Sequence, residues 1–115
     1  MLVQVRVARW VVYLLRCGDD TLYCGMTNDI ERRLAAHRAG RGARYTRGRS
    51  PLELLHTERA RDRGDALRRE AAWKRLTRTE KLRLIEVAKA RAKQRAKKAA
   101  QRVRKTRAGL PATTA

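Results

Sequence analysis

The chain has 115 residues, with 30 lysines and arginines against 11 aspartates and glutamates, a formal charge of +19. A chain this short forms one small domain with at most one appendage. So large a positive charge favours a polyanionic partner. Of the 30 basic residues 23 are arginines, whose guanidinium groups match the geometry of phosphate. We therefore expect nucleic acid as the partner. No run without charge or glycine is longer than that of residues 10–15, which is too short to span a membrane, so we expect no membrane partner.

The two cysteines, Cys17 and Cys24, have neither the spacing of a zinc site nor enough partners for a disulfide framework. They are typical of free thiols in a reducing compartment. We therefore expect a cytoplasmic protein, associated with the nucleoid if the source is bacterial.

Two short runs rich in β-branched and aromatic residues, 10–17 and 21–26, flank the turn sequence Gly-Asp-Asp and predict a β-hairpin. Each run contains one of the chain's three tyrosines, Tyr13 and Tyr23. A hairpin loop with an odd number of residues would place the two tyrosines opposite each other on one face. A two-residue loop would instead pair Tyr13 with Cys24 and turn the tyrosines to opposite faces. The sequence leaves both registers open.

The segment 28–40 changes to a helical period, with Asn28 as the expected cap, Glu31 as its capping-box partner and a glycine at its end. Arg33 and His37 lie four residues apart, on one flank of this helix. A basic, glycine-rich loop over 41–50 follows. Its arginines interleave with an aromatic residue, which suits phosphate contact and base stacking. The candidate nucleic-acid contacts in this loop are Arg44, Tyr45, Arg47 and Arg49.

A third strand is predicted over 51–58, at a sheet edge because it begins with proline. Two helices are predicted over 62–76 and 77–90, capped by Asp62 and Thr77. Glu70 falls on the apolar stripe of the first of them, where a carboxylate needs a partner or a cation. The order predicts an α+β fold, a small three-stranded antiparallel sheet flanked by helices.

Charge divides the chain near residue 88. Residues 89–115 contain ten basic residues and no acidic one. We therefore predict a domain over 1–88 and a basic C-terminal arm over 89–115, either a helical extension or a disordered segment. Phosphate contacts are expected along this arm, with Lys93, Lys97 and Lys98 as candidates.

The predicted fold could bring a carboxylate, an arginine, a histidine and two phenols together, which is about the set that phosphodiester hydrolysis needs. These residues resemble the GIY-YIG nuclease domain. Val11-Val12-Tyr13 and Tyr23-Cys24-Gly25 match its two triplets, and Arg33, the Arg-Tyr-Thr loop and Glu70 match at their spacing. The resemblance covers residues 10–88 and is close to the small stand-alone bacterial members. It extends to the catalytic subunit of the eukaryotic branched-DNA resolving nuclease.

The resemblance implies that Glu70 holds a divalent cation, Mg²⁺ or another, and that Arg33 stabilises the pentavalent phosphate. It implies that Tyr13 or Tyr23, helped by His37, acts on the attacking water. Several relatives have an asparagine after the metal glutamate, which is missing here, and Lys74 is the candidate substitute.

We therefore expect a metal-dependent endonuclease that cuts DNA rather than RNA, with structured or branched DNA as a candidate substrate and DNA repair as a context. The alternative is a non-catalytic nucleic-acid-binding protein built on a degenerate nuclease domain, which the missing asparagine favours. A third reading is an interaction module within a larger complex.

Overall fold

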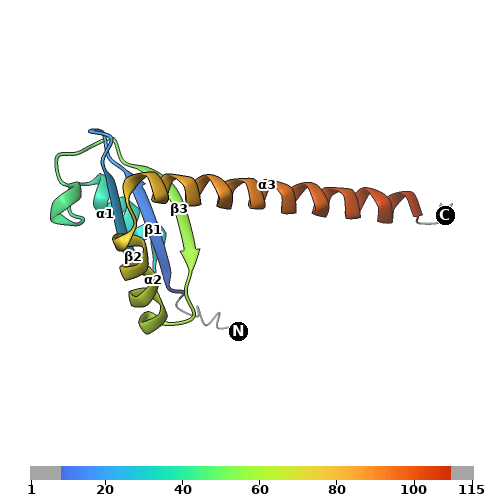
Figure 1. Cartoon of the computed structure of the whole chain (residues 1–115), viewed down its shortest axis with the longest axis horizontal. Helices are drawn as coiled ribbons and strands as arrows, with labels where there is room; N and C mark the ends of the chain where they lie inside the picture. Colours follow the sequence, from blue (N-terminus) through green and yellow to red (C-terminus); the bar gives the residue numbers. More distant parts are fainter. Residues whose placement is uncertain (1–8, 110–115) are drawn as a thin grey trace, which may run out of the picture. The chain divides into compact units, whose positions relative to one another are not determined.

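The computed structural model describes residues 9–109 of the chain. Its elements follow the predicted order (Figure 1). They are the strands β1 (Val11–Arg16), β2 (Leu22–Thr27) and β3 (Glu53–Arg59), the helices α1 (Ile30–Arg38), α2 (Arg63–Arg75) and α3 (Arg78–Gly109), and a short 3₁₀ turn over Arg44–Thr46. The α+β prediction is confirmed. No helix among the described residues is long and apolar enough to cross a membrane.

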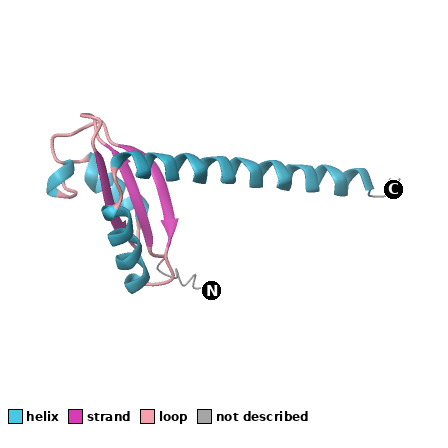
Figure 2. Ribbon diagram, in the orientation of Figure 1, coloured by secondary structure: helices cyan, strands magenta, loops and turns pink. Residues whose placement is uncertain are grey.

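The three strands form one antiparallel sheet in the order β2-β1-β3 (Figure 2). The strand that begins after Pro51 is an edge strand, as predicted. The central strand β1 is buried on both faces, since Val12, Tyr13, Leu14 and Leu15 are all fully inaccessible to solvent. This burial follows from its place between two strands and two helices, so β1 forms the centre of the core.

Each face of the sheet is covered by its own helix. Tyr13 contacts side chains of α1, whereas the next residue, Leu14, pairs with His56, whose ring packs 5.3 Å from that of Trp73 in α2. Because successive strand side chains point to opposite faces, α1 lies on the Tyr13 face and α2 on the Leu14 face.

The hairpin register differs from both predicted alternatives. Tyr13 pairs with Gly25, and Tyr23 pairs with Leu15. The two tyrosines therefore share one face but are diagonal neighbours, offset by two residues, with ring centroids 6.2 Å apart. A hydrogen bond from the backbone N–H of Cys17 to the backbone oxygen of Thr21 closes the loop over 17–21. Within this loop Asp20 has a positive φ of 67°.

The predicted cap of α1 was wrong by one residue. Asp29, not Asn28, is the N-cap, and its carboxylate accepts a hydrogen bond from the Arg32 backbone N–H at 3.2 Å. The Thr27 hydroxyl accepts a hydrogen bond from Asp29 N at 3.1 Å, and this tight turn moves the helix start one residue along. The Glu31 capping box consequently does not form. The caps predicted for the other two helices are confirmed, at Asp62 and Thr77.

The basic arm is helical over its described part, because α3 continues without a break to Gly109. The last residues, 110–115, lie outside the described part. The chain divides into two compact units between Lys81 and Leu82, so that most of α3 belongs to the second unit. The division at residues 88 and 89, based on charge, stays a prediction.

Candidate active site

Four predicted site residues meet on the α1 face of the sheet. Tyr13 and Tyr23 come from the hairpin, and Arg33 and His37 come from successive turns of α1. The Tyr13 hydroxyl lies 2.8 Å from His37 Nε2, and Arg33 Nε donates a hydrogen bond to the same hydroxyl at 3.3 Å. The Tyr23 ring packs edge-on to the His37 ring, with centroids 5.4 Å apart. Alternation in the strands and the four-residue spacing in the helix together produce this cluster.

The hydrogen bonds around His37 fix its tautomer. The Thr46 hydroxyl donates its proton to Ala43 O at 2.9 Å, so toward His37 Nδ1, 2.7 Å away, it can act only as an acceptor. Nδ1 therefore carries the hydrogen, and Nε2 presents a lone pair to the Tyr13 hydroxyl. The donors in this series of hydrogen bonds all point the same way, from Arg33 through Tyr13, His37 and Thr46 to the backbone carbonyl of Ala43.

Burial governs the acidity of these groups. It raises the pKa of the Tyr13 phenol to about 12, because the hydrogen bond from Arg33 only partly offsets the cost of a buried phenolate. Burial, followed by the charge of Arg33, lowers the pKa of His37 below 6.5. The neutral phenol and the neutral imidazole are thus the resting forms at neutral pH. The hydrogen bond to Tyr13 is the main cause of the raised pKa of Arg33.

Two glycines make room for the cluster. A Cβ atom on Gly25 would lie 2.5 Å from Tyr13 Oη, and one on Gly42 would lie 2.2 Å from His37 Nδ1. Neither neighbour can move aside, since Tyr13 and His37 are 0% and 1% exposed. Gly25 thus leaves a space that the Tyr13 phenol occupies. The roles of Gly42 and Thr46 were missed, because no periodic pattern connects their loop with α1.

Replacing Gly25 by alanine is therefore expected to destabilise the fold by about 1–3 kcal/mol, as overpacking of a tight core does. Urea unfolding would measure the change. Gly64→Ala is the matched control, because its Cβ would meet nothing closer than 3.4 Å. In helix α2 that change should be neutral or stabilise by about 0.5–1 kcal/mol. Equal stability of the two variants would contradict the steric role of Gly25.

Glu70 is not joined to the cluster by any hydrogen bond or ion pair within residues 9–109. It lies on α2 with its side chain 17% exposed, and its Oε1 forms an ion pair with Lys74 Nζ at 2.8 Å. Burial raises the pKa of the Cys24 thiol to about 11, and the negative charge of Glu70 adds to the shift. Glu70 thus lies near the edge strand β2, on the face opposite to Tyr23.

The carboxylate of Glu70 fits one kind of metal site. The described residues contain no group of three or more histidine, cysteine, aspartate or glutamate side chains that could enclose a metal. A single, largely buried carboxylate instead suits Mg²⁺, which commonly takes one or two carboxylates and completes its shell with water and phosphate oxygens. Glu70 is the residue that could hold such an ion, in competition with Lys74.

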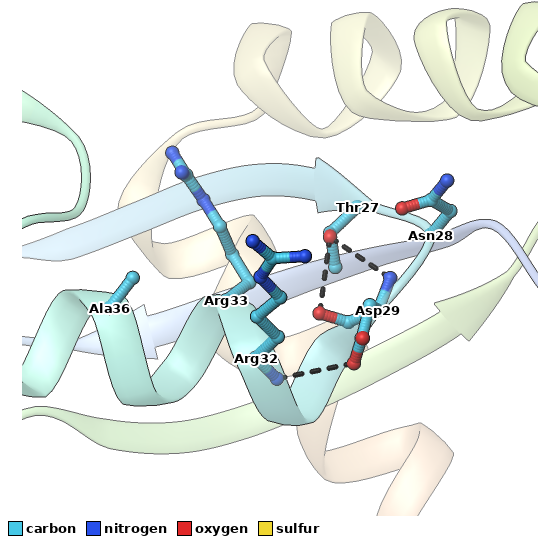
Figure 3. A pocket seen from close by; sticks show the side chains of 6 residues that line it. All are labelled: Thr27, Asn28, Asp29, Arg32, Arg33 and Ala36. Carbon is cyan, nitrogen blue, oxygen red and sulfur yellow. Dashed lines mark hydrogen bonds between the residues drawn. The ribbon is translucent and has the colours of Figure 1, made fainter.

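A polar pocket of about 310 Å³ opens beside the cluster at the start of α1 (Figure 3). Its lining residues are Thr27, Asn28, Asp29, Arg32, Arg33 and Ala36. Arg33 therefore both lines this pocket and donates to Tyr13. The second guanidinium, that of Arg32, is exposed.

The loop residues predicted to bind nucleic acid separate into two groups. Arg44 and Arg47 are exposed. The other two contact the rest of the domain. The Tyr45 ring stacks on that of Tyr23, with centroids 5.9 Å apart. The Arg49 guanidinium lies 4.3 Å from the centroid of the Tyr45 ring, and its Nη1 forms an ion pair with Asp19. Lys93, Lys97 and Lys98 are exposed on α3. Contact of these residues with nucleic acid stays a prediction.

Residues 9–83 match the model of the GIY-YIG catalytic domain. The chain belongs to the GIY-YIG family. The predicted family is confirmed, and membership supports a nuclease-type function that acts on nucleic acid. The glycine of the second GIY-YIG triplet, Gly25, is the residue that admits the tyrosine of the first, Tyr13.

Similar proteins match about two thirds of this chain. A UPF0213 protein of Natronomonas pharaonis is 54% identical over 74 residues, 64% of this chain and 87% of that protein. A UPF0213 protein of Nitratidesulfovibrio vulgaris is 59% identical over 73 residues, 64% of this chain and 66% of that protein. The solution structure of a protein from E. faecalis is 37% identical, with a TM-score of 0.49 over 70% of this chain and 86% of that one.

Proposed function

We propose that this GIY-YIG protein is a divalent-metal-dependent endonuclease that hydrolyses phosphodiester bonds in DNA, including structured or branched DNA. The observation that carries the proposal is the directional hydrogen-bond chain through Tyr13, His37 and Thr46. Any buried phenol needs a hydrogen-bond acceptor. What distinguishes Tyr13 is that its acceptor is a titratable imidazole and that a guanidinium donates to the same oxygen. Here the Tyr13 proton already points at the lone pair of a neutral imidazole.

Tyr13 is the tyrosine we assign to the attacking water, because it has this acceptor. A phenol with a pKa of about 12 is almost never ionised at neutral pH, so a free phenolate cannot be the base. The proposed step requires that Tyr13 Oη, which is buried in the free protein, becomes accessible beside Arg33 when nucleic acid binds. A water proton then passes to Tyr13 Oη as the Tyr13 proton passes to His37 Nε2. The water oxygen attacks phosphorus, the P–O bond to the ester oxygen breaks, and the leaving oxygen takes a proton from solvent. Thr46 accepts from Nδ1–H throughout and stabilises the imidazolium that forms.

Arg33 is assigned to the charge that develops on the phosphate. Its Nε is used on Tyr13, which leaves its terminal nitrogens for phosphate oxygens. Glu70 would hold the divalent ion, which, when bound, supplies Lewis-acid polarisation of a phosphate oxygen. Tyr23 lies on one face of the edge strand β2, and Glu70 lies near the opposite face of the same strand. A nucleic acid lying along this edge could therefore contact both.

The test compares cleavage of linear duplex, single-stranded and branched DNA, and of RNA, with Mg²⁺ and with EDTA. Cutting that needs Mg²⁺ and is lost in Tyr13→Phe, while binding is retained, would support the proposal. Tight binding without cutting of any substrate would contradict it. That result would favour the non-catalytic alternative, to which the ion pair of Lys74 on Glu70 and the missing asparagine both point.

The relay predicts an acid limb in the pH profile. His37 must be neutral to receive the Tyr13 proton, so activity should fall as pH falls through the pKa of His37. Because burial lowers that pKa, the midpoint in kcat/KM should lie below 6.5. The other histidine, His56, provides the control, since it lies on the α2 face and its pKa is lowered too. His37→Gln should abolish most activity, whereas His56→Gln should keep the limb in place. A limb that disappears in His56→Gln would contradict the relay.

A further inference from the structure

The part of α3 beyond the GIY-YIG match has a charge distribution that the proposed chemistry does not use. From residue 87 onward the chain contains no acidic residue. Every residue from 91 to 106 is exposed, and within the described chain no side chain of this segment takes part in an ion pair. Such a helix is stabilised by external anions rather than by internal pairs.

The basic residues form two rows rather than one face. At about 100° per residue, they separate into rows that are about 155° apart around the axis. The first row is Lys89, Lys93, Lys97 and Arg104, and the second row is Arg91, Arg95, Lys98, Arg102 and Lys105. Rows nearly opposite each other cannot both lie against a single phosphate backbone. They can both be satisfied where one backbone lies on each side of the helix.

The two strips between the rows differ in character. The narrower strip contains Ala90, Gln94 and Gln101, and the wider one is a small apolar strip of Ala92, Ala96, Ala99 and Val103. A hollow in the helix surface is lined by Gln94 together with Arg91, Arg95 and Lys98. The glutamine strip is therefore the side toward which both rows of cations converge.

We infer that the segment 89–105 of α3 lies in the major groove of B-form duplex DNA, with its glutamine strip toward the base edges and one basic row on each backbone. This inference deepens the proposed function by naming duplex DNA as the ligand of this helix. The B-form major groove is about 12 Å wide and admits an α-helix, whereas the A-form groove of duplex RNA is deep and narrow. Glutamine can bond to base edges in that groove, and continuous basic helices bind there in other proteins.

The first test measures the salt dependence of binding, with the full chain in EDTA so that metal-dependent cutting does not interfere. The probe is a 24-bp duplex DNA, followed by fluorescence anisotropy. One variant replaces Lys89, Lys93, Lys97 and Arg104 by alanine, and the other replaces Arg91, Arg95, Lys98 and Arg102. Each removes four charges, and alanine keeps the helix, which circular dichroism would verify. Each variant should reduce the slope of log K against log salt by about 3–4. A reduction in only one variant, or in neither, would overturn the two-backbone geometry.

The second test determines which strip faces the groove. Gln94→Glu with Gln101→Glu places two carboxylates on the glutamine strip. Ala92→Glu with Ala99→Glu places the same charges, at the same spacing, on the apolar strip. On duplex DNA the glutamine pair should weaken binding at least tenfold more than the alanine pair. On duplex RNA of the same sequence the two pairs should weaken binding equally. Equal effects on DNA, or the same difference on RNA, would overturn the inference.

Failure of this inference and failure of the proposed function are distinguishable. The differences in binding in EDTA between the wild type and the α3 variants report on α3, and cutting in Mg²⁺ reports on the Tyr13 cluster. If the wild type cuts DNA and all four variants bind as tightly as the wild type, the proposed function stands and the groove geometry is overturned. If the variants show the expected differences in binding but the wild type cuts no substrate, the groove geometry stands and the proposed function is overturned.

Discussion

Glu70→Gln is expected to lower metal-dependent cleavage by about 10³-fold or more, since removal of the carboxylate proposed to hold the metal removes the Lewis acid together with its charge. The reason for choosing glutamine is that it keeps the size of the side chain in a largely buried position. Cleavage would be measured as kcat/KM across a Mg²⁺ titration, with binding followed in parallel. Binding of nucleic acid in EDTA should be unchanged or stronger, because one negative charge is lost.

The control for this variant is Glu53→Gln, which removes an exposed carboxylate on β3 whose nearest partner, Arg16 Nη1, is 3.9 Å away. That variant should retain cleavage within about twofold, because loose surface ion pairs contribute little. A Glu70→Gln protein with unchanged cleavage at low Mg²⁺ would contradict the assignment of the metal carboxylate. A loss restored by high Mg²⁺ would support it, since the effect would then be on metal affinity.

Arg33→Ala is expected to lower kcat by about 10³-fold, the range found when a single donor to transition-state charge is removed. Two effects combine: the phosphate loses a guanidinium, and Tyr13 loses its hydrogen-bond donor. Removal of Arg33 also removes the positive charge that helps to lower the pKa of His37. Residual activity should therefore show an acid limb shifted toward higher pH, which a single-turnover pH profile would measure.

Arg32→Ala is the matched control, because it removes the same charge from the same helix turn and the same pocket without touching Tyr13. It should raise KM modestly and leave kcat almost unchanged. Equal losses of kcat in Arg32→Ala and Arg33→Ala would contradict the specific role of Arg33. They would indicate that the pocket acts only through its net charge.

The architecture separates the proposed chemistry into two places. The proton relay is buried between β1 and α1, where exclusion of water fixes the neutral forms of Tyr13 and His37. The carboxylate lies on the other face, at the edge of the sheet. In the proposed function, a substrate backbone along β2 would connect the two places.

The sequence by itself determined the elements and their order, because these depend on local patterns. Structure is specified within a few residues by the runs of β-branched and aromatic residues, the turn after Cys17, the caps Asp62 and Thr77 and the proline before β3. The spacing of Arg33 and His37 likewise placed them on one flank of α1. The family followed from the same short motifs and their separation.

Only the tertiary structure decided how these elements meet. The sequence allowed two hairpin registers, and the observed pairing of Tyr13 with Gly25 is neither. In this pairing the Tyr13 phenol occupies the space that a side chain at position 25 would fill. The tautomer of His37 depends on Thr46, nine residues away in a loop without periodicity. The position of Glu70 on the opposite face depends on how α2 packs. These contacts join residues distant in the chain, and a local pattern contains no information about them.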